Sequence, residues 1–120
     1  MFAFALWDKK EKSLFLVRDR LGEKPLYYGY QKGVFLFGSE IKSIKAHPNF
    51  VGLIDRDSIA LQLRHNCIPA PYSIFKGIKK LPPGTFLKFP VTSKMALEQY
   101  FPEPKKYWSF AEIANSAIDR

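Results

Sequence analysis

Residues 1–38 read MFAFALWDKKEKSLFLVRDRLGEKPLYYGYQKGVFLFG, a succession of apolar runs separated by short polar or glycine-containing connections. This pattern is typical of antiparallel strands joined by tight turns. It predicts strands at 2–7, 14–18, 26–30 and 34–38, and connections this short predict a local meander. Each run is apolar at both odd and even positions, so we expect both faces of these strands to be covered.

After these strands the pattern changes to that of short helices. Ser39 is a candidate cap for a first helix, which His47-Pro48 would end. A second helix is predicted to start at Asp55 or Asp57. The apolar residues that we expect to pack inward from this region are Leu53, Ile59, Leu61 and Leu63.

The second half of the chain is rich in proline. Seven of the nine prolines lie within residues 69–104, so we expect this segment to be mostly irregular. Within it, the Leu-Pro-Pro-Gly sequence at 81–84 has the chemistry of a type II turn, and residues 85–89 read as an isolated strand. The capping box Ser-Phe-Ala-Glu at 109–112 predicts a final helix. That helix would stop at Arg120 after about three turns, so we expect a truncated chain.

The composition is that of a globular protein, with 47% hydrophobic and 25% charged residues in a chain of 120. Disordered, collagen-like and coiled-coil classes are therefore excluded. The longest apolar run, residues 1–7, is too short to span a bilayer and lacks the features of a secretory signal. The single cysteine, Cys67, excludes an internal disulfide framework and favours a reducing, cytoplasmic location.

The net charge of +8 comes from 19 Lys and Arg against 11 Asp and Glu. The excess is spread along the chain, and the densest basic run, at 76–80, holds only three charges. A nucleic-acid binder is expected to cluster its bases on one face. A solvated surface is therefore favoured, and a basic nucleic-acid-binding module is kept as a minor alternative.

No complete catalytic set is present in the sequence. His65 and Cys67 lie close together but have no third or fourth ligand type beside them, which argues against a metal site. The phosphate-binding patterns GxxxxGK[ST] and GxGxxG are absent. We therefore expect Cys67 to be a small buried or half-buried side chain. Taken alone, the charged residues at 18–20 are more typical of solvated ion pairs than of ligands.

Four strings, in order and over nearly the whole chain, resemble glutamine-hydrolysing asparagine synthetases. They are MFAFALWD (1–8), RDRLGEKPLYY (18–28), FGSEIKSI (37–44) and IPAPYSIFKGIKKLPPG (68–84). A looser form of the second string, Arg-Asp-x-x-Gly-x-x-Pro-Leu, occurs across class II glutamine amidotransferases. The pair Tyr107-Trp108 also falls where the family often has such a pair. By this resemblance the chain is identified as the C-terminal half of a class II glutaminase domain with its linker.

The resemblance implies an α+β fold that is part of an N-terminal-nucleophile hydrolase, a four-layer αββα sandwich. Residues 1–66 would be the C-terminal half of the glutaminase-type domain, and residues 67–106 a Pro-rich closing segment and linker. Residues 107–120 would start a truncated helix that leads to the synthetase domain. The implied partners are the N-terminal half of the glutaminase domain, the downstream synthetase domain and a second copy in a parent homodimer; a membrane partner is not expected.

The parent enzyme would form asparagine, glutamate, AMP and diphosphate from aspartate, glutamine and ATP. Its glutaminase step needs a cysteine at the mature N-terminus, whose thiol attacks the substrate amide. This chain starts Met1-Phe2 and Cys67 is internal, so no catalytic residue is expected here. The parent would use ATP and Mg²⁺, but the Ser-Gly-Gly-x-Asp-Ser type loop is absent, so no cofactor site is assigned to this chain. The isolated chain is expected to be inactive.

What remains is scaffold and interface. By resemblance, Met1 lies where the family's ammonia tunnel passes, and Arg18–Leu26 lies towards the synthetase domain. The candidate tunnel or interface residues are Met1, Arg18, Asp19, Arg20, Ser39 and Glu40. Two alternatives remain open: a family relative that amidates another carboxylate, and a freestanding, non-catalytic binding or regulatory subunit.

Overall fold

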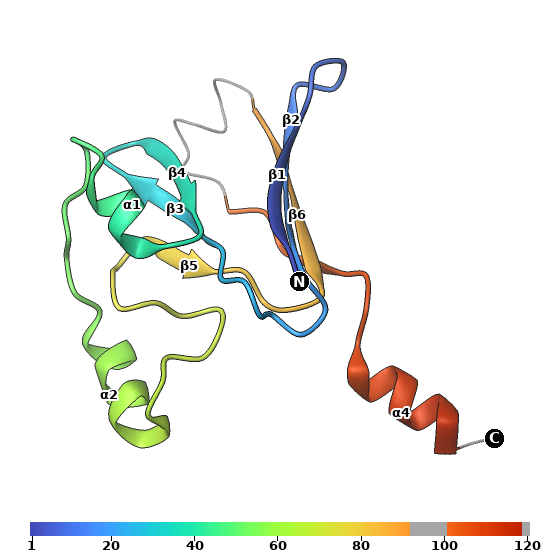
Figure 1. The fold of residues 1–120 in the computed structure, drawn as a ribbon. Helices are drawn as coiled ribbons and strands as arrows, with labels where there is room; N and C mark the ends of the chain where they lie inside the picture. Colours follow the sequence, from blue (N-terminus) through green and yellow to red (C-terminus); the bar gives the residue numbers. More distant parts are fainter. Residues whose placement is uncertain (92–100, 119–120) are drawn as a thin grey trace.

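The computed structural model describes residues 1–91 and 101–118, which form two antiparallel sheets and three helices (Figure 1). Sheet A has the order β1 (Ala3–Asp8), β2 (Ser13–Arg18), β6 (Thr85–Pro90), β7 (Lys105–Lys106). Sheet B has the order β4 (Val34–Gly38), β3 (Tyr27–Gln31), β5 (Ile78–Lys80). The helices are α1 (Ile41–Lys45), α2 (Arg56–His65) and α4 (Phe110–Ile118). The part of the expected linker at 92–100 and the last two residues of the expected final helix lie outside the described residues.

The four predicted N-terminal strands form, but the predicted meander is wrong. The β1–β2 hairpin belongs to sheet A and the β3–β4 hairpin to sheet B, so β2 and β3 are not neighbours. The connection between them turns at Gly22, whose φ is +71°, and carries the chain from one sheet to the other. The second partner of β2 is instead β6, with Leu16 opposite Leu87. A strand partner this distant in sequence leaves no local signal.

The described part of the Pro-rich segment at 69–104 is mostly irregular, as predicted, but it supplies β5 in addition to β6. The strand predicted at 85–89 is confirmed as β6, but it is not isolated, since it pairs with both β2 and β7. Pro90 occupies the last position of β6, where a missing N–H group interferes least with the ladder. The turn predicted at 81–84 agrees with the φ of +66° at Gly84.

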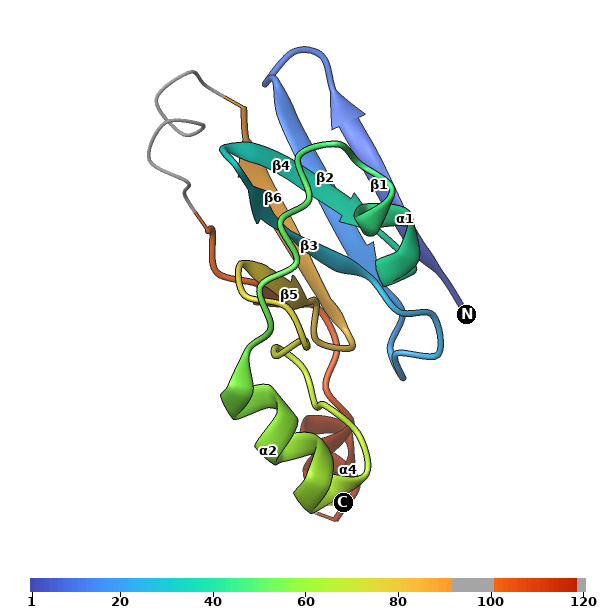
Figure 2. The same ribbon diagram turned by 90° about the vertical axis from the view of Figure 1, so that its left-hand side faces the viewer.

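The core lies between the two sheets, which are stacked face to face (Figure 2). Its fully buried cluster consists of Leu16, Leu26, Tyr28, Leu81 and Leu87. Phe35 of β4 stacks on Phe89 of β6, with ring centroids 4.4 Å apart, and so joins the sheets. Burial raises the pKa of Tyr28 to about 12. Sequence-distant segments therefore share one interior.

Coverage of the outer faces differs between the sheets. The short helix α1 lies against β4 and buries Ile44 on the outer side of sheet B. On the outer side of sheet A, Phe4 is 46% and Leu6 57% exposed, and none of the described residues covers them. The expectation that both faces of these strands are covered is therefore wrong for β1.

The helices begin close to the predicted positions. Glu40, rather than Ser39, is the cap residue of α1, and it makes no side-chain capping bond. Asp55 caps α2, because its Oδ1 accepts from the Asp57 N–H at 3.1 Å. Helix α4 starts after Ser109, whose carbonyl oxygen accepts from the Ile113 N–H at 3.3 Å.

The predicted inward packing of the second helical region is wrong. Leu53 is 61%, Ile59 37% and Leu63 80% exposed, Leu61 is only half-buried, and the buried residue of α2 is Ser58. Apolar residues spaced two apart point to different sides of a helix that repeats every 3.6 residues, so residues 59, 61 and 63 cannot share one face. Within 1–91 and 101–118, no helix has both the length and the hydropathy needed to cross a membrane.

Candidate functional site

The interpretation of Arg18 as a solvated charge is wrong. Arg18 ends β2 and is only 7% exposed. Its guanidinium donates to the carbonyl oxygens of Gly22 at 2.8 Å, Lys24 at 2.9 Å and Leu81 at 2.5 Å. Burial lowers the pKa of Arg18, and the neighbouring Asp19 carboxylate partly offsets this effect. The side chain therefore fastens the 20–25 loop to the turn at 81–84.

Asp19 is also buried, at 3% exposure, and it clamps the start of β1. Its Oδ2 accepts from the Phe2 N–H at 3.1 Å, and its own N–H donates to the Phe2 carbonyl oxygen at 2.9 Å. The Asp19 carbonyl oxygen accepts from the N–H groups of Gly22 at 3.3 Å and Gly84 at 2.8 Å. Three segments that are far apart in sequence therefore meet at one residue.

The electrostatic state of Asp19 follows from these contacts. Desolvation by burial raises the pKa of Asp19, but the N–H groups of Phe2, Gly22, Lys24 and Glu23 outweigh it, so the net pKa is below the ordinary value. Its Oδ1 is buried and accepts no hydrogen bond within the described part of the chain. Asp19 is therefore ionised at neutral pH and is held in place by main-chain dipoles.

The C-terminal segment joins the same place. The Tyr107 hydroxyl donates to the Arg18 carbonyl oxygen, and the N–H groups of Tyr107 and Trp108 donate to the Gly84 carbonyl oxygen at 3.0 and 3.3 Å. The Arg20 guanidinium lies 5.9 Å from the centre of the Trp108 ring, within cation–π range. Burial and then the Asp19 carboxylate raise the pKa of Tyr107, so its hydroxyl keeps its proton at neutral pH.

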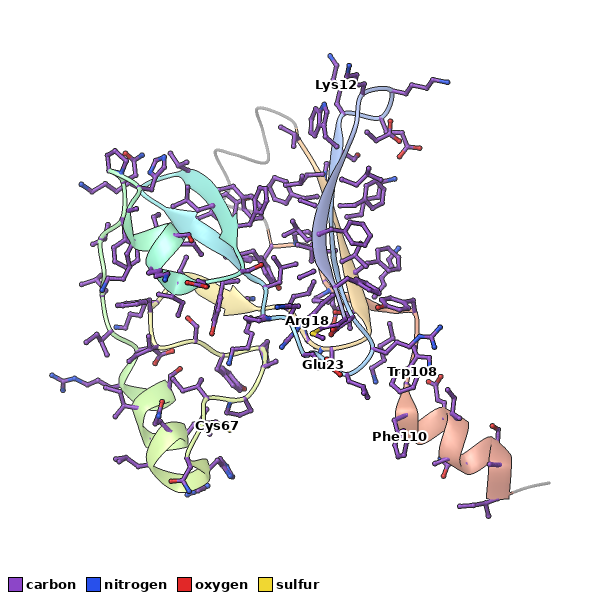
Figure 3. The ribbon with its side chains drawn as sticks, viewed as in Figure 1. Lys12, Arg18, Glu23, Cys67, Trp108 and Phe110 are labelled. Carbon is purple, nitrogen blue, oxygen red and sulfur yellow. The ribbon has the colours of Figure 1, made fainter. Side chains whose placement is uncertain are left out.

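A cavity of about 600 Å³ opens beside these residues, which we call the junction pocket. It is lined by Met1, Phe2, Asp19, Arg20, Leu21, Glu23, Trp108 and Phe110. Its volume falls within the range of ligand pockets. Its lining combines apolar side chains with the charged side chains of Asp19, Arg20 and Glu23, so the pocket can bind a group of mixed apolar and polar character. Figure 3 shows Arg18, Glu23 and Trp108 at the same end of sheet A, where α4 begins.

A second surface, the outer apolar face of sheet A, adjoins the junction pocket through Phe2. It forms an open depression of about 320 Å³, lined by Phe2, Phe4, Leu6, Phe15, Val17, Phe86 and Tyr107. Every one of these side chains is apolar or aromatic. An exposed, contiguous apolar area of this kind is typical of a surface that another polypeptide covers.

The structure brings some of the sequence candidates together and not others. Met1, Asp19 and Arg20 line the junction pocket, and Arg18 holds its loop in place. Ser39 and Glu40 lie instead at the start of α1 beside sheet B, where both are exposed. Glu40 pairs with Lys42 at 3.0 Å on this surface. The six candidates therefore do not form one site.

Cys67 is exposed, so the expectation of a buried or half-buried side chain is wrong. It follows the left-handed residue Asn66, which ends α2 with a φ of +60°. Figure 3 places Cys67 on the sheet B side of the molecule, away from Trp108 and Phe110. Within residues 1–91 and 101–118, no three His, Cys, Asp or Glu side chains come together as a metal site.

Sequence reasoning missed the contacts that build the junction. The sequence predicts Gly84 as a turn residue, Phe2 as a strand residue and Trp108 as part of a family-like pair, but it predicts no contact between them. The one local signal was Pro83-Gly84, which indicates a turn but not what the turn touches. No sequence rule pairs residue 107 with residue 18, so the Tyr107 contact was out of reach.

Comparisons with known proteins bear on these surfaces. A family model described as "Glutamine amidotransferase domain" matches residues 1–108. The chain is 46% identical over 91 residues to glutamine-hydrolysing asparagine synthetase 3 of Bacillus subtilis, which is 74% of this chain and 15% of that protein. It is 31% identical over 101 residues to asparagine synthetase 1 of the same organism, covering 84% of this chain and 16% of that protein.

A relative with a different name is also similar. The amidase chyE of Penicillium rubens is 37% identical over 90 residues, which is 72% of this chain and 12% of that protein. The chain thus spans less than a fifth of the length of each of these three relatives. The family model, in contrast, matches most of the chain, from β1 to Trp108. The chain therefore belongs to the glutamine amidotransferase domain family.

Proposed function

We propose that residues 1–120 are the C-terminal half of the glutaminase domain, with its linker, of a glutamine-hydrolysing asparagine synthetase. The complete enzyme would convert aspartate, glutamine and ATP into asparagine, glutamate, AMP and diphosphate. The observation that carries the proposal is the 46% identity to B. subtilis asparagine synthetase 3 over 74% of this chain. These residues would act as scaffold and interface rather than perform a chemical step.

The arrangement of layers supports this role. The two stacked sheets and α1 would be three layers of a four-layer αββα sandwich of the N-terminal-nucleophile hydrolase type. The fourth layer would cover the outer apolar face of sheet A and would come from the N-terminal half of the domain. Residues 1–66 would belong to the glutaminase half, residues 67–106 would close its sheets and form the linker, and residues 107–120 would lead towards the synthetase domain.

The glutamine-attacking cysteine would come from that N-terminal half. Cys67 cannot replace it, because the α-amine of an internal residue is part of a peptide bond and cannot act as the base. By this proposal, the isolated 120 residues hydrolyse no glutamine. The single thiol is consistent with a cytoplasmic location, where cysteines stay reduced.

ATP and Mg²⁺ would bind elsewhere in the complete enzyme. The Ser-Gly-Gly-x-Asp-Ser type loop of the family is not part of this sequence, so we propose that both groups bind in the synthetase domain. The junction pocket would instead face the synthetase domain, with Met1 beside the ammonia route. Its lining of apolar residues together with the charged Asp19, Arg20 and Glu23 is suited to a protein interface.

A segment exchange tests the proposal. The part of B. subtilis asparagine synthetase 3 that matches this chain is replaced by the corresponding residues of this chain. Asparagine formation is then measured separately with glutamine and with ammonia as nitrogen source. We expect the chimera to use both, because the scaffold would still join the two half-reactions.

An Arg18→Ala version of the chimera is the matched control. It should lose glutamine-dependent synthesis and keep ammonia-dependent synthesis, because only the glutaminase half would be disordered. A folded chimera that uses ammonia but not glutamine would contradict the proposal.

A second candidate is a relative that amidates a different carboxylate, and the similarity to amidase chyE favours keeping it. A freestanding binding subunit is the third. The neighbouring DNA separates a family enzyme from a freestanding subunit. An upstream frame beginning Met-Cys and a downstream frame with the Ser-Gly-Gly loop would indicate a synthetase gene, whereas a freestanding subunit would have neither beside it.

A further inference from the structure

Among the described residues, helix α4 projects from the body of the molecule with only its first residue, Phe110, lining the junction pocket. Figure 1 shows it projecting from the end of sheet A, and none of its residues is buried. Phe110 is 70%, Ile113 49% and Ile118 80% exposed. A nine-residue helix without tertiary packing has little stability of its own. Its direction must therefore be set by the segment that precedes it.

That segment is attached at three points. Lys105 and Lys106 form β7 and pair with Phe86 and Thr85 of β6. The next two N–H groups, of Tyr107 and Trp108, converge on the Gly84 carbonyl oxygen. The Tyr107 hydroxyl then donates to the Arg18 carbonyl oxygen. Together these contacts hold the chain up to the residue before Ser109.

Gly84 is matched to this approach. Its φ of +66° is in the left-handed region, and a Cβ built there would lie 2.6 Å from the Trp108 carbonyl oxygen. Any side chain at this position would push Trp108 away from the turn. The left-handed φ and the close approach of Trp108 therefore both require glycine at this position.

The acceptor of the tyrosine bond is itself held firmly. Arg18 lies at the end of β2, opposite Ala3 of β1, and its guanidinium is bound to three carbonyl oxygens. The next residue, Asp19, clamps Phe2. A displacement at the start of β1 would therefore reach Tyr107 through two neighbouring residues.

We propose that Tyr107 and Gly84 form a latch that fixes the direction of α4 relative to sheet A and that opens by releasing β7 while β1, β2 and β6 stay paired. The latch lies outside the buried cluster formed by Leu16, Leu26, Tyr28, Leu81 and Leu87. Tyr107 is 41% exposed, so losing its hydroxyl leaves no cavity. Through Asp19 and Arg18 the latch couples the start of β1 to the position of α4.

Limited trypsin digestion at low protein concentration tests the latch, since three sites report on three events. Cleavage after Lys9 reports on an exposed turn, cleavage after Lys88 on opening of sheet A, and cleavage after Lys106 on the latch. We expect Tyr107→Phe to raise cleavage after Lys106 about fivefold, the effect of one lost hydrogen bond. Cleavage after Lys9 and Lys88 should not change.

Two controls isolate the effect. Tyr72→Phe removes the hydroxyl of another exposed tyrosine and should alter none of the three rates. Short peptides spanning residues 101–112, with and without Tyr107→Phe, correct for any change in the intrinsic cleavage rate. The proposal is overturned if Tyr107→Phe accelerates cleavage after Lys88 and Lys106 equally. It is also overturned if the unchanged chain is cleaved after Lys106 as fast as after Lys9.

A distance measurement tests the direction of α4 itself. Spin labels are attached through Lys9→Cys and Asn115→Cys in a Cys67→Ser background. We expect one narrow distance distribution, which Tyr107→Phe broadens and Tyr72→Phe does not. A broad distribution before the tyrosine is changed would refute the latch. Neither readout uses enzymatic activity, so the latch and the proposed function can fail independently.

Discussion

Arg18 and Asp19 are adjacent charged residues that bind main-chain groups from three parts of the chain, at Phe2, at residues 22–24 and at the turn 81–84. Buried charges are strongly unfavourable unless their hydrogen-bonding capacity is met, and main-chain dipoles meet most of it here. Arg18 takes three carbonyl oxygens, whereas Asp19 takes an N–H and lies beside others. The positively charged Arg18 therefore binds main-chain carbonyl oxygens, whereas the negatively charged Asp19 binds a main-chain N–H group.

Asp19→Asn should make the stability less dependent on acidic pH. Because the pKa of Asp19 is lowered on folding, its ionised form stabilises the fold above the unfolded pKa of about 3.9. That stabilisation is lost as the pH falls through the lower folded value. At pH 7 we expect the free energy of unfolding of Asp19→Asn to be about 1–2 kcal/mol lower than that of the unchanged chain. This difference should shrink below a pH of about 4.

Urea unfolding from pH 7 to pH 3 measures this difference. Asp57→Asn, at an exposed position in α2, is the control for simply removing a carboxylate. A difference between Asp19→Asn and the unchanged chain that stays constant down to pH 3 would show that the Asp19 charge is not what the fold uses.

Gly84→Ala tests the close approach of Trp108. The left-handed φ alone costs an alanine about 1–2 kcal/mol, and the contact with the Trp108 carbonyl oxygen adds to it. Gly33→Ala is the matched control, because Gly33 has a φ of +78° with nothing within 4 Å of a built Cβ. The urea midpoint of unfolding should therefore fall further for Gly84→Ala than for Gly33→Ala. Equal shifts would show that the contact with the Trp108 carbonyl oxygen adds nothing to the cost.

Strand β1 is an edge strand whose outer face is exposed to solvent. Among residues 1–91 and 101–118 it pairs only with β2, and its outward side chains Phe4 and Leu6 are about half exposed. An apolar edge without a blocking charge is a template for another strand. We therefore expect this strand to mediate association of the isolated chain.

We expect the double variant Phe4→Thr, Leu6→Thr to reduce self-association of the chain at micromolar concentration. Threonine keeps the preference for a strand but removes the apolar side chains that would be shared between copies. Sedimentation velocity measures the effect, and far-ultraviolet circular dichroism checks that the sheets persist. Leu63→Thr, which changes an 80% exposed leucine on α2, should leave association unaltered. Association equal in all three proteins would place the contact elsewhere.

The elements that could be predicted from the sequence were those with local signals. The cap at Asp55, the turn at Gly84 and the positions of the first four strands depend on neighbouring residues, and the structure has them. The meander was mistaken because pairing of β2 with β6 is non-local. The buried state of Arg18 was missed for the same reason, since one of its acceptors, Leu81, belongs to a distant turn.

At the scale of the whole molecule, the chain is less compact than a self-contained domain. Its radius of gyration is 15.7 Å, against about 13.6 Å for a compact domain of this length. Its principal extents of 52 × 44 × 23 Å describe a flat body, to which the projecting α4 adds length. The shape agrees with the uncovered outer face of sheet A.

We therefore expect the isolated chain to be marginally stable and to self-associate. Sedimentation and a thermal melt measure both properties, and adding the N-terminal half of a related glutaminase domain in trans should reduce association by covering the outer apolar face. A monodisperse monomer that melts cooperatively above roughly 50 °C would show that residues 1–120 suffice for a stable fold.

The isolated chain should also release no ammonia from glutamine above the buffer rate. Cys67, its single thiol, is internal and lies far from the junction pocket in Figure 3. Ammonia release is assayed for the unchanged chain and for Cys67→Ser, and both should match the buffer. Activity that disappears with Cys67→Ser would overturn the assignment of the chemistry to another segment.

The pairing of β2 with β6 also delays folding of sheet A during synthesis. Leu16 cannot meet Leu87 until the ribosome has added the residues between them, which takes roughly 4 to 14 s at typical rates of elongation. During that interval β2 lacks its central partner β6, so the inner apolar face of the β1–β2 hairpin is uncovered. We therefore expect this hairpin to be a binding segment for chaperones for several seconds during synthesis.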